Sequence, residues 1–327
     1  MEQKYFVQIA AQLSITTKQV ESIFNMQADG ATIPFMARYR KEVTGNLDEV
    51  VIGKVVEEIA YLKELHKRKE TIIKTIQEQG KLTADLQKRI DDCFLATALE
   101  DIYLPYKPKR KTRATQATEK GLEPLAALLF AQTSFDVDRE ASKFLNDEVK
   151  DVKEALQGAR DIIAEWISEN EMARAALRKI FAQSATLSSK IVTTKKDEAD
   201  AQKYRDYFEF SGSLAQSPSH RILAIRRGEK DGFLMMDISI DRTTAIETLE
   251  NMFVKAANLA ATEVKKAIED CYNRLLKFSV ENEFRLQSKS KADEEAIFVF
   301  TENLRQLLLA SPLGAKRVLA LDPGFRS

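Results

Sequence analysis

Glycine and proline are scarce in this chain of 327 residues, which contains 11 glycines and 7 prolines. Both residues interrupt helices and mark turns, so a fold rich in tight turns needs many of them. Their scarcity argues against a turn-rich β fold. It favours a chain made mainly of helices.

Cysteine and histidine are also rare, and no glycine-rich phosphate loop of the Walker or Rossmann type occurs. Cys93 and Cys271 lie far apart in apolar segments, which predicts two small buried side chains in a reducing compartment and no disulfide. His66 and His220 have no neighbouring Cys/His cluster that would bind zinc, and neither lies beside a nucleophile motif. We therefore expect a protein without catalytic activity, metal or cofactor.

The chain has no net charge, because 50 basic residues balance 50 acidic ones. No global field attracts nucleic acid or a membrane, so any such binding must come from local patches. The first ten residues lack the basic and apolar regions of a signal peptide, and no apolar run is long enough to span a membrane. We expect a cytoplasmic monomer without a membrane partner.

The strongest local departure from neutrality is the run Lys107–Arg113, with five cationic residues and no acid. Pro105 and Pro108 disfavour a helical backbone, both at the prolines themselves and at the residue before each of them. We therefore predict an extended, exposed strap over residues 105–124. Two interpretations stay open, of which composition alone favours the second: a phosphate-binding strap, or a solvated linker lying on an acidic helix face. The candidate phosphate contacts are Lys107, Lys109, Arg110, Lys111 and Arg113.

Two short amphipathic helices are predicted at the N-terminus, over residues 3–13 and 17–28, with Thr16 suited to cap the second. Such a pair resembles a helix-turn-helix, although most pairs of this kind are only packing units.

The segment that follows alternates cations with an aromatic ring, in the order Arg38, Tyr39, Arg40 and Lys41. This pattern suits a site where cations bind a nucleic-acid backbone while the ring stacks on a base. The alternative is that the arginines pair with carboxylates on a neighbouring helix.

The sequence TIPFMARYRKEVTGNLDEV, residues 32–50, closely resembles a signature of the Tex family of bacterial transcription accessory proteins. The resemblance continues in the family's order through further long stretches at residues 98–126, 204–211, 218–232 and 302–326. It implies a parent protein that binds single-stranded RNA or DNA with little sequence preference. That parent would act near RNA polymerase or other parts of the transcription and translation machinery.

Residues 317–324, RVLALDPG, resemble the first strand of an RNase H-like or RuvC-like domain, which begins at this place in the family. In such domains the first aspartate, here Asp322, can bind a catalytic metal. The other strands and carboxylates needed for two-metal hydrolysis do not follow, so we expect a fragment without nuclease activity. In the family, the missing part would carry helix-hairpin-helix motifs and an OB-fold RNA-binding domain.

Other elements are expected from periodicity and capping residues. A long helix should run over 49–79 and stop at Gly80, and another should run from Thr83 to the strap. A short helix capped by Ser217 should end at Gly228 and carry two further candidate phosphate contacts, Arg226 and Arg227. Helices are expected at 138–149, 151–168 and 170–183, with Asp138, Asp151 and Asn170 as their caps. The remaining expectations are helices at 243–279 and 290–310, a strand or loop within 184–203, and a strand within 232–240.

The expected architecture is therefore a mainly α, multi-helical scaffold with a small β element. Its expected parts are a helical domain over 1–104, the strap over 105–124, a central region over 125–316 and the strand segment 317–327. Two functions remain open. The first is a non-enzymatic module that binds single-stranded nucleic acid, and the second is a protein-interaction scaffold for RNA polymerase or its factors.

Overall fold

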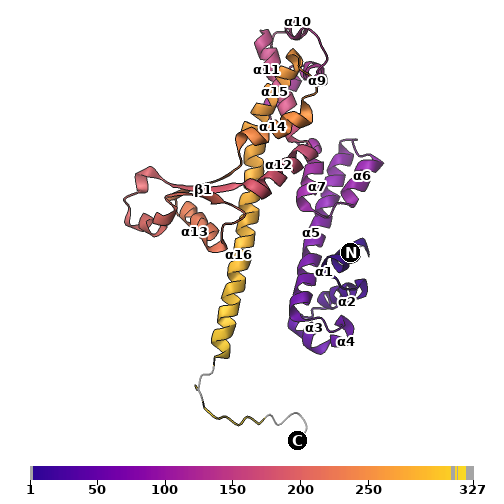
Figure 1. Ribbon diagram of the computed structural model, residues 1–327. Coiled ribbons are helices and arrows are strands. Elements are labelled where there is room, and N and C mark those ends of the chain that lie inside the picture. The colour runs from indigo at the N-terminus through magenta and orange to yellow at the C-terminus, as the bar shows by residue number, and fades with distance from the viewer. Residues whose placement is uncertain (1–2, 311–313, 315, 322–327) are drawn as a thin grey trace. The chain divides into compact units, whose positions relative to one another are not determined.

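The computed structural model describes residues 3–310, 314 and 316–321, and within this part the chain forms sixteen α-helices and one small antiparallel sheet (Figure 1). The expected mainly α class is confirmed. Residues 316–321 have no regular secondary structure. Asp322 lies outside the described residues.

The chain divides into two compact units. The first unit comprises residues 1–112 together with 169–171, and the second comprises 113–168 and 172–327. Each unit has its own large cluster of buried apolar side chains. None of the helices that the structure describes is long and apolar enough to cross a membrane.

The first unit is built around the 30-residue helix α5, whose inward face is apolar at helical spacing. Helices α1, α2 and α3 pack against it. The helix begins where the Asp48 carboxylate accepts a hydrogen bond from the Val51 backbone N–H, and it stops at Gly80, whose φ of +67° favours glycine. The helices of this unit are α1 (Gln3–Leu13), α2 (Thr17–Ala28), α3 (Ile33–Tyr39), α4 (Lys41–Thr44), α5 (Glu49–Glu78), α6 (Ala84–Asp91) and α7 (Ala96–Tyr103).

One helix expected from Thr83 to the strap is in fact two, α6 and α7. Thr83 does cap α6, accepting a hydrogen bond from the Leu86 N–H. The chain then becomes extended at Leu95, and a side chain from α5 holds the break. The Tyr61 hydroxyl donates to the Phe94 carbonyl at 3.2 Å and accepts from the Ala96 N–H at 2.9 Å. This bridge replaces the helical hydrogen bonds that would otherwise continue α6.

The second unit has a helical part in which α11 packs against α8, α9 and α15. Asp151 caps α11 as expected, accepting a hydrogen bond from the Glu154 N–H at 2.7 Å. A short π-helical turn, Tyr272–Leu276, joins α15 directly to α16. The helices are α8 (Arg113–Glu119), α9 (Glu123–Ala131), α10 (Val137–Ser142), α11 (Val152–Ser168), α12 (Glu171–Ser184), α13 (Ser219–Lys230), α14 (Arg242–Phe253), α15 (Leu259–Cys271) and α16 (Lys277–Leu309).

Two expected helices of this unit have wrong boundaries. The helix expected at 138–149 ends at Ser142, because the Asn146 side chain accepts hydrogen bonds from the N–H groups of Glu148 and Val149 and closes a turn there. Asp138 is not its cap, since Asp136 accepts the capping bond from Arg139 N–H.

The helix expected at 243–279 is interrupted at residues 254–258, whereas the gap expected at 280–289 lies inside the continuous α16. Gln132, from the end of α9, holds the interruption: its side chain donates to the Phe253 carbonyl and accepts from the Lys255 N–H, each at 2.7 Å. Asn258 then caps α15 through the Ala261 N–H.

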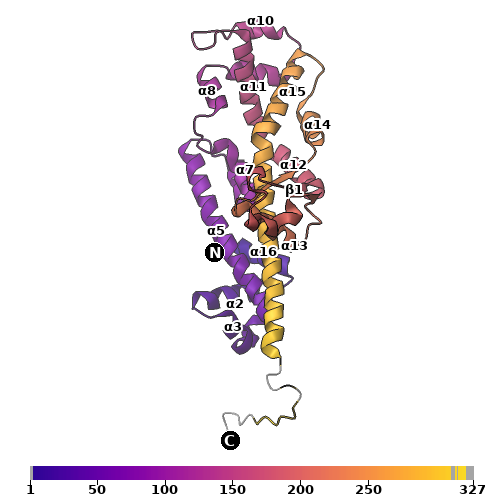
Figure 2. The same ribbon diagram turned by 90° about the vertical axis from the view of Figure 1, so that its left-hand side faces the viewer.

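The sheet consists of β1 (Thr186–Ile191), β2 (Glu209–Ser213) and β3 (Leu234–Ser239), in the order β2-β1-β3 with both pairs antiparallel. The strand expected within 232–240 is confirmed as β3, and the strand-or-loop segment 184–203 contains β1. Strand β2 was not expected. Figures 1 and 2 show α13 and the sheet beside α16, against which α13 and β3 pack.

Helix α13 begins and ends differently from expectation. Pro218 occupies the N-cap position, and the Ser217 hydroxyl donates instead to the Ser213 carbonyl at 2.8 Å. Gly228 is inside the helix, which runs on to Lys230. A Cβ atom at Gly228 would lie 2.6 Å from Leu234 Cδ1, so this glycine serves the close approach of α13 to β3.

Candidate nucleic-acid interface

The strap is shorter than the predicted 105–124. Residues 104–106 form a 3₁₀ turn, and α8 already begins at Arg113. Residues 107–112 lack helical structure, and a short turn over 120–122 separates α8 from α9. Lys107, the residue before Pro108, has the extended backbone that proline imposes on its predecessor.

All five cationic residues of the strap are exposed, but they are not equivalent. The Lys109 ammonium lies 2.6 Å from a carboxylate oxygen of Glu169, which belongs to the same compact unit. This ion pair agrees with the second interpretation of the strap, in which its cations lie on acidic residues elsewhere in the chain. Lys107 and Arg110 form no ion pair within the described part of the chain, so they are available to phosphate groups.

Arg113 is the first residue of α8 and lines a cavity of about 200 Å³ together with Lys120, Glu154 and Asp161. Burial raises the pKa of Asp161, and the charges of Arg274 and Arg113 oppose this rise. Lys120 is paired with Glu154 at 2.7 Å and lowers the pKa of that carboxyl. Acids and bases balance around this cavity, so it is not an anion site.

The second group of predicted contacts lies where α3 meets α4, and we call Phe35, Arg38, Tyr39, Arg40 and Lys41 the α3–α4 corner. Thr32 caps α3 by accepting from the Phe35 N–H, and Pro34 stands in its first turn. Tyr39 is 69% exposed and Phe35 39% exposed. Their ring centroids are 5.6 Å apart, with the planes tilted by 41°.

The three cations of the corner differ in their contacts. Arg38 is paired with Glu49 at 3.2 Å, as the alternative interpretation predicted. The Arg40 guanidinium instead lies 5.6 Å from the centre of the Phe35 ring. Lys41 forms no ion pair among the described residues. Of the three cations, the structure thus places Arg40 directly against one of the two rings. Phe35 was missed at first, although it stands four residues before Tyr39 and so shares its helix face.

The third group lies on α13 in the second unit. Arg226 is half-buried and paired with Glu229 at 3.4 Å, and Glu229 also bonds to Arg285. Arg227 is exposed. The charge of Arg226 is thus already neutralised within the fold. The exposed Arg227 lines a feature of the surface instead.

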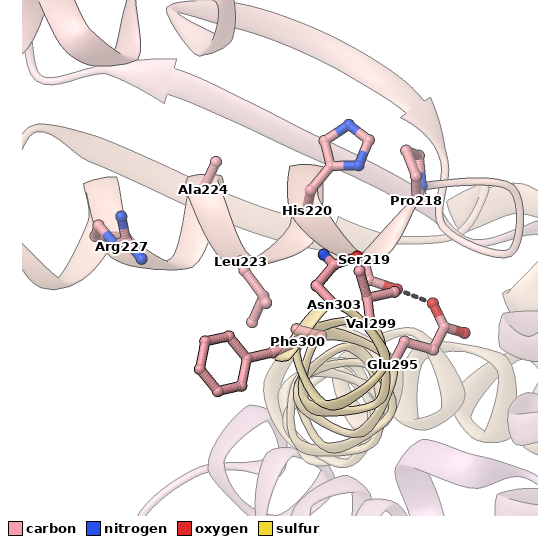
Figure 3. Close-up of a pocket in the computed structure, with 11 residues that line it drawn as sticks. Pro218, Ser219, His220, Leu223, Ala224, Arg227, Glu295, Val299, Phe300 and Asn303 are labelled. Carbon is pink, nitrogen blue, oxygen red and sulfur yellow. Dashed lines mark hydrogen bonds between the residues drawn. The ribbon is translucent and has the colours of Figure 1, made fainter. Parts of the chain in front are cut away.

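That feature is an apolar groove of about 650 Å³ between α13 and α16 (Figure 3). Leu223 of α13 points toward α16, where Val299 and Phe300 line the other side. Ser219 and Glu295 are hydrogen-bonded across one end of the groove, and Arg227 lies toward the other end of α13. An apolar lining of this kind suits a side chain or helix better than a phosphate chain.

The N-terminal helix pair does not have the surface of a groove reader. Ile9 and Ile23 are fully buried, and both helices pack on α5. The exposed side of α2 carries Lys18 and Glu21, whose charges cancel. The arrangement is therefore better explained as a packing unit than as a helix-turn-helix that enters DNA.

Among the described residues, no group of three or more His, Cys, Asp and Glu side chains is placed to hold a metal ion. Burial raises the pKa of the Cys271 thiol above its ordinary value. Such a thiol is a poor nucleophile, because the reactive form is the thiolate.

Comparisons with known proteins match two parts of the chain to the Tex family. Residues 3–77 match the family described as Tex-like protein N-terminal domain, and residues 132–300 match the Tex central region-like family. The transcriptional accessory protein Tex of Neisseria gonorrhoeae is 39% identical over 325 residues, which cover 98% of this chain and 43% of that protein.

Two further relatives extend the comparison. The protein tex of Bordetella pertussis is 39% identical over 340 residues, covering 99% of this chain and 43% of that protein. The human S1 RNA-binding domain-containing protein 1 is 29% identical over 322 residues, covering 93% of this chain and 32% of that protein. The chain thus spans less than half the length of the relatives it matches. The chain belongs to the Tex family of transcription accessory proteins.

Proposed function

We propose that this chain is a non-enzymatic scaffold of a cytoplasmic transcription accessory protein, and that it binds single-stranded RNA or DNA with little sequence preference. The observation that carries the proposal is the strap, residues 107–113, whose five cations are exposed on a segment without helical structure over 107–112. The names of the relatives, a transcriptional accessory protein and an S1 RNA-binding domain protein, support a role of this kind.

The charges of the strap suggest how binding should respond to salt. Lys109 is already paired with Glu169, and Arg113 lines the charge-balanced cavity, so Lys107 and Arg110 are the clearest phosphate contacts of the strap. Each phosphate neutralised on a single strand contributes about −0.7 to the slope of log affinity against log salt. We therefore expect these two residues to contribute about −1.4 to the slope, with little discrimination between base sequences, since phosphates carry no sequence information.

The test is a fluorescence anisotropy titration of the chain with a single-stranded RNA of about 20 nucleotides at several salt concentrations. The variant Lys107→Glu/Arg110→Glu reverses two cations that form no ion pair in the described fold. It should weaken binding and make the salt slope shallower, with an unchanged melting temperature. The matched control is Lys54→Glu/Lys74→Glu, which reverses two exposed lysines of α5 and should leave RNA affinity much closer to that of the unmodified chain.

A second candidate function is a protein-interaction scaffold for RNA polymerase or its factors. The ion pair between Lys109 and Glu169 favours it, because it shows one strap cation used within the fold, and so does the apolar groove between α13 and α16. If this function is the correct one, the chain does not bind RNA even at low salt. In that case Lys109→Glu should lower the melting temperature, because it places two acids against each other.

A further inference from the structure

We infer that the α3–α4 corner is a stacking platform for unpaired bases of single-stranded RNA or DNA. This inference rests on the proposed nucleic-acid function and adds a second site to it, one that recognises bases where the strap binds phosphates. Four observations support it: the exposure of two rings, their fixed position, the cations around them, and the distance to the strap.

The first two observations concern the rings. Phe35 and Tyr39 stand on the outer face of α3, while Met36 and Ala37 on its inner face are buried. The Thr32 cap and Pro34 fix the start of the helix, so the two rings are held on a rigid element. Large aromatic side chains exposed to water lose the benefit of burial, and a base can restore it by stacking on them.

The charges of the corner fit a site where stacking supplies most of the affinity. The Arg38–Glu49 pair is exposed, and exposed pairs contribute little, so Arg38 can exchange its partner for a phosphate. Arg40 and Lys41 add two more cations, whereas Glu42 and Glu49 offset part of the positive charge. The cations of the corner should therefore bind a nucleic-acid backbone only weakly, so the affinity of the site depends on its rings.

The corner and the strap lie at opposite ends of α5. Arg38 contacts Glu49 at the beginning of α5, and Gln79, just after its end, donates a hydrogen bond to the Tyr106 carbonyl beside the strap at 2.7 Å. Thirty residues of helix separate the two ends by about 45 Å. A long single strand can contact both sites, whereas a very short one can contact only one of them at a time.

The test uses Tyr39→Leu, which removes a ring at an exposed position and should leave the melting temperature unchanged. The probes are a thymidine DNA of about 20 nucleotides and an abasic strand of equal length, which carries the same phosphates without bases. We expect Tyr39→Leu to weaken the thymidine strand about tenfold, within the range for loss of one base stack, without changing its salt slope. Binding of the abasic strand should not change. Tyr39→Phe keeps a ring and should retain most of the affinity.

The matched control is Phe278→Leu. Phe278 is an exposed ring in the second unit, 55% exposed, with the Lys277 ammonium 5.7 Å from its centre. Loss of the Phe278 ring should not alter the affinity for either strand. A photocrosslink from 5-iodouracil in the strand should map to Tyr39 or Phe35.

Two results overturn the inference, and they can be told apart. If the chain binds no single strand at all, the proposed function fails together with the platform. The second result is that the chain binds the thymidine strand and the abasic strand with a salt slope that depends on the strap, while Tyr39→Leu changes the affinity for neither strand. In that case only the platform fails. The exposed rings would then mark a protein contact, since tyrosine and arginine are enriched in such interfaces.

Discussion

At the scale of single residues, side-chain hydrogen bonds hold the ends of several elements in the described part of the chain. Tyr204 and Asp231 form one such contact, with the hydroxyl donating to the carboxylate at 2.5 Å. Burial and this hydrogen bond raise the pKa of Tyr204 to about 12. The same bond, helped by the charge of Lys203, lowers the pKa of Asp231. The pair ties the 3₁₀ segment Ala199–Tyr207 to the end of α13.

Replacing Tyr204 by phenylalanine should therefore change the acid stability of the protein. Because the pKa of Asp231 is lower in the folded state than its usual value of about 3.9, its carboxylate stabilises the fold above that pH. This stability is lost as the pH falls through the folded-state pKa. In Tyr204→Phe the pKa of the Asp231 carboxyl should rise toward its usual value. The free energy of unfolding should then decrease less as the pH is lowered.

Carboxyl NMR titration of Asp231 and melting curves in acid measure these two effects. Tyr207→Phe, which removes a hydroxyl from a half-buried ring nearby, should leave both unchanged. An unaltered Asp231 titration in Tyr204→Phe would show that the lysine and not the hydroxyl sets this pKa.

At the scale of elements, several helix starts could be predicted from local capping residues, although the caps expected for α10 and α13 were wrong, and helix breaks could not be predicted. Thr16, Asp48 and Thr83 cap helices through atoms within three residues of them, so the local sequence contains the whole interaction. The breaks after α6 and α14 depend on Tyr61 and Gln132, which come from distant parts of the chain. No local pattern contains these partners.

The same limit applies to the candidate site. The charge run and the alternation of Arg38, Tyr39 and Arg40 predicted exposed cations, and all three residues are exposed. The Lys109–Glu169 pair joins residues 60 positions apart in sequence, and that pairing appears only in the folded chain. Arg226 was also predicted as a phosphate contact, but here the local sequence did contain the answer, because its ion-pair partner Glu229 is one turn away on the same helix.

The packing of α13 on β3 gives a prediction at this scale. Gly228→Ala places a methyl group 2.6 Å from Leu234 Cδ1 and 3.2 Å from Tyr204 Cδ1, so neighbouring side chains must move. We expect a loss of about 1 to 3 kcal/mol in the free energy of unfolding, measured by urea denaturation. Gly53→Ala in α5 is the control, since nothing lies within 4 Å of its added Cβ. It should stabilise by about 0.5 to 1 kcal/mol, and equal effects at both sites would refute the packing argument.

At the scale of the whole molecule, the chain has two large apolar clusters that share no residue. One includes Ile59 and the rest of the α5 face, and the other includes Leu177, Ile225 and the α11–α15 contact. Sequence composition suggested a boundary at the strap, near residue 105, and the contacts divide the chain between residues 112 and 113. The two clusters raise the question of whether the units unfold as one cooperative system or as two.

We expect two transitions in differential scanning calorimetry, because each unit buries its own apolar surface. Ile59→Ala removes a fully buried side chain of the first cluster and should lower one transition, by an amount corresponding to about 2 to 5 kcal/mol. Gly228→Ala should lower only the other, because its neighbours Leu234 and Tyr204 both belong to the second unit. A single transition that both variants shift equally would show one cooperative fold. In that case the two clusters would unfold together, and each variant would report on the stability of the whole chain.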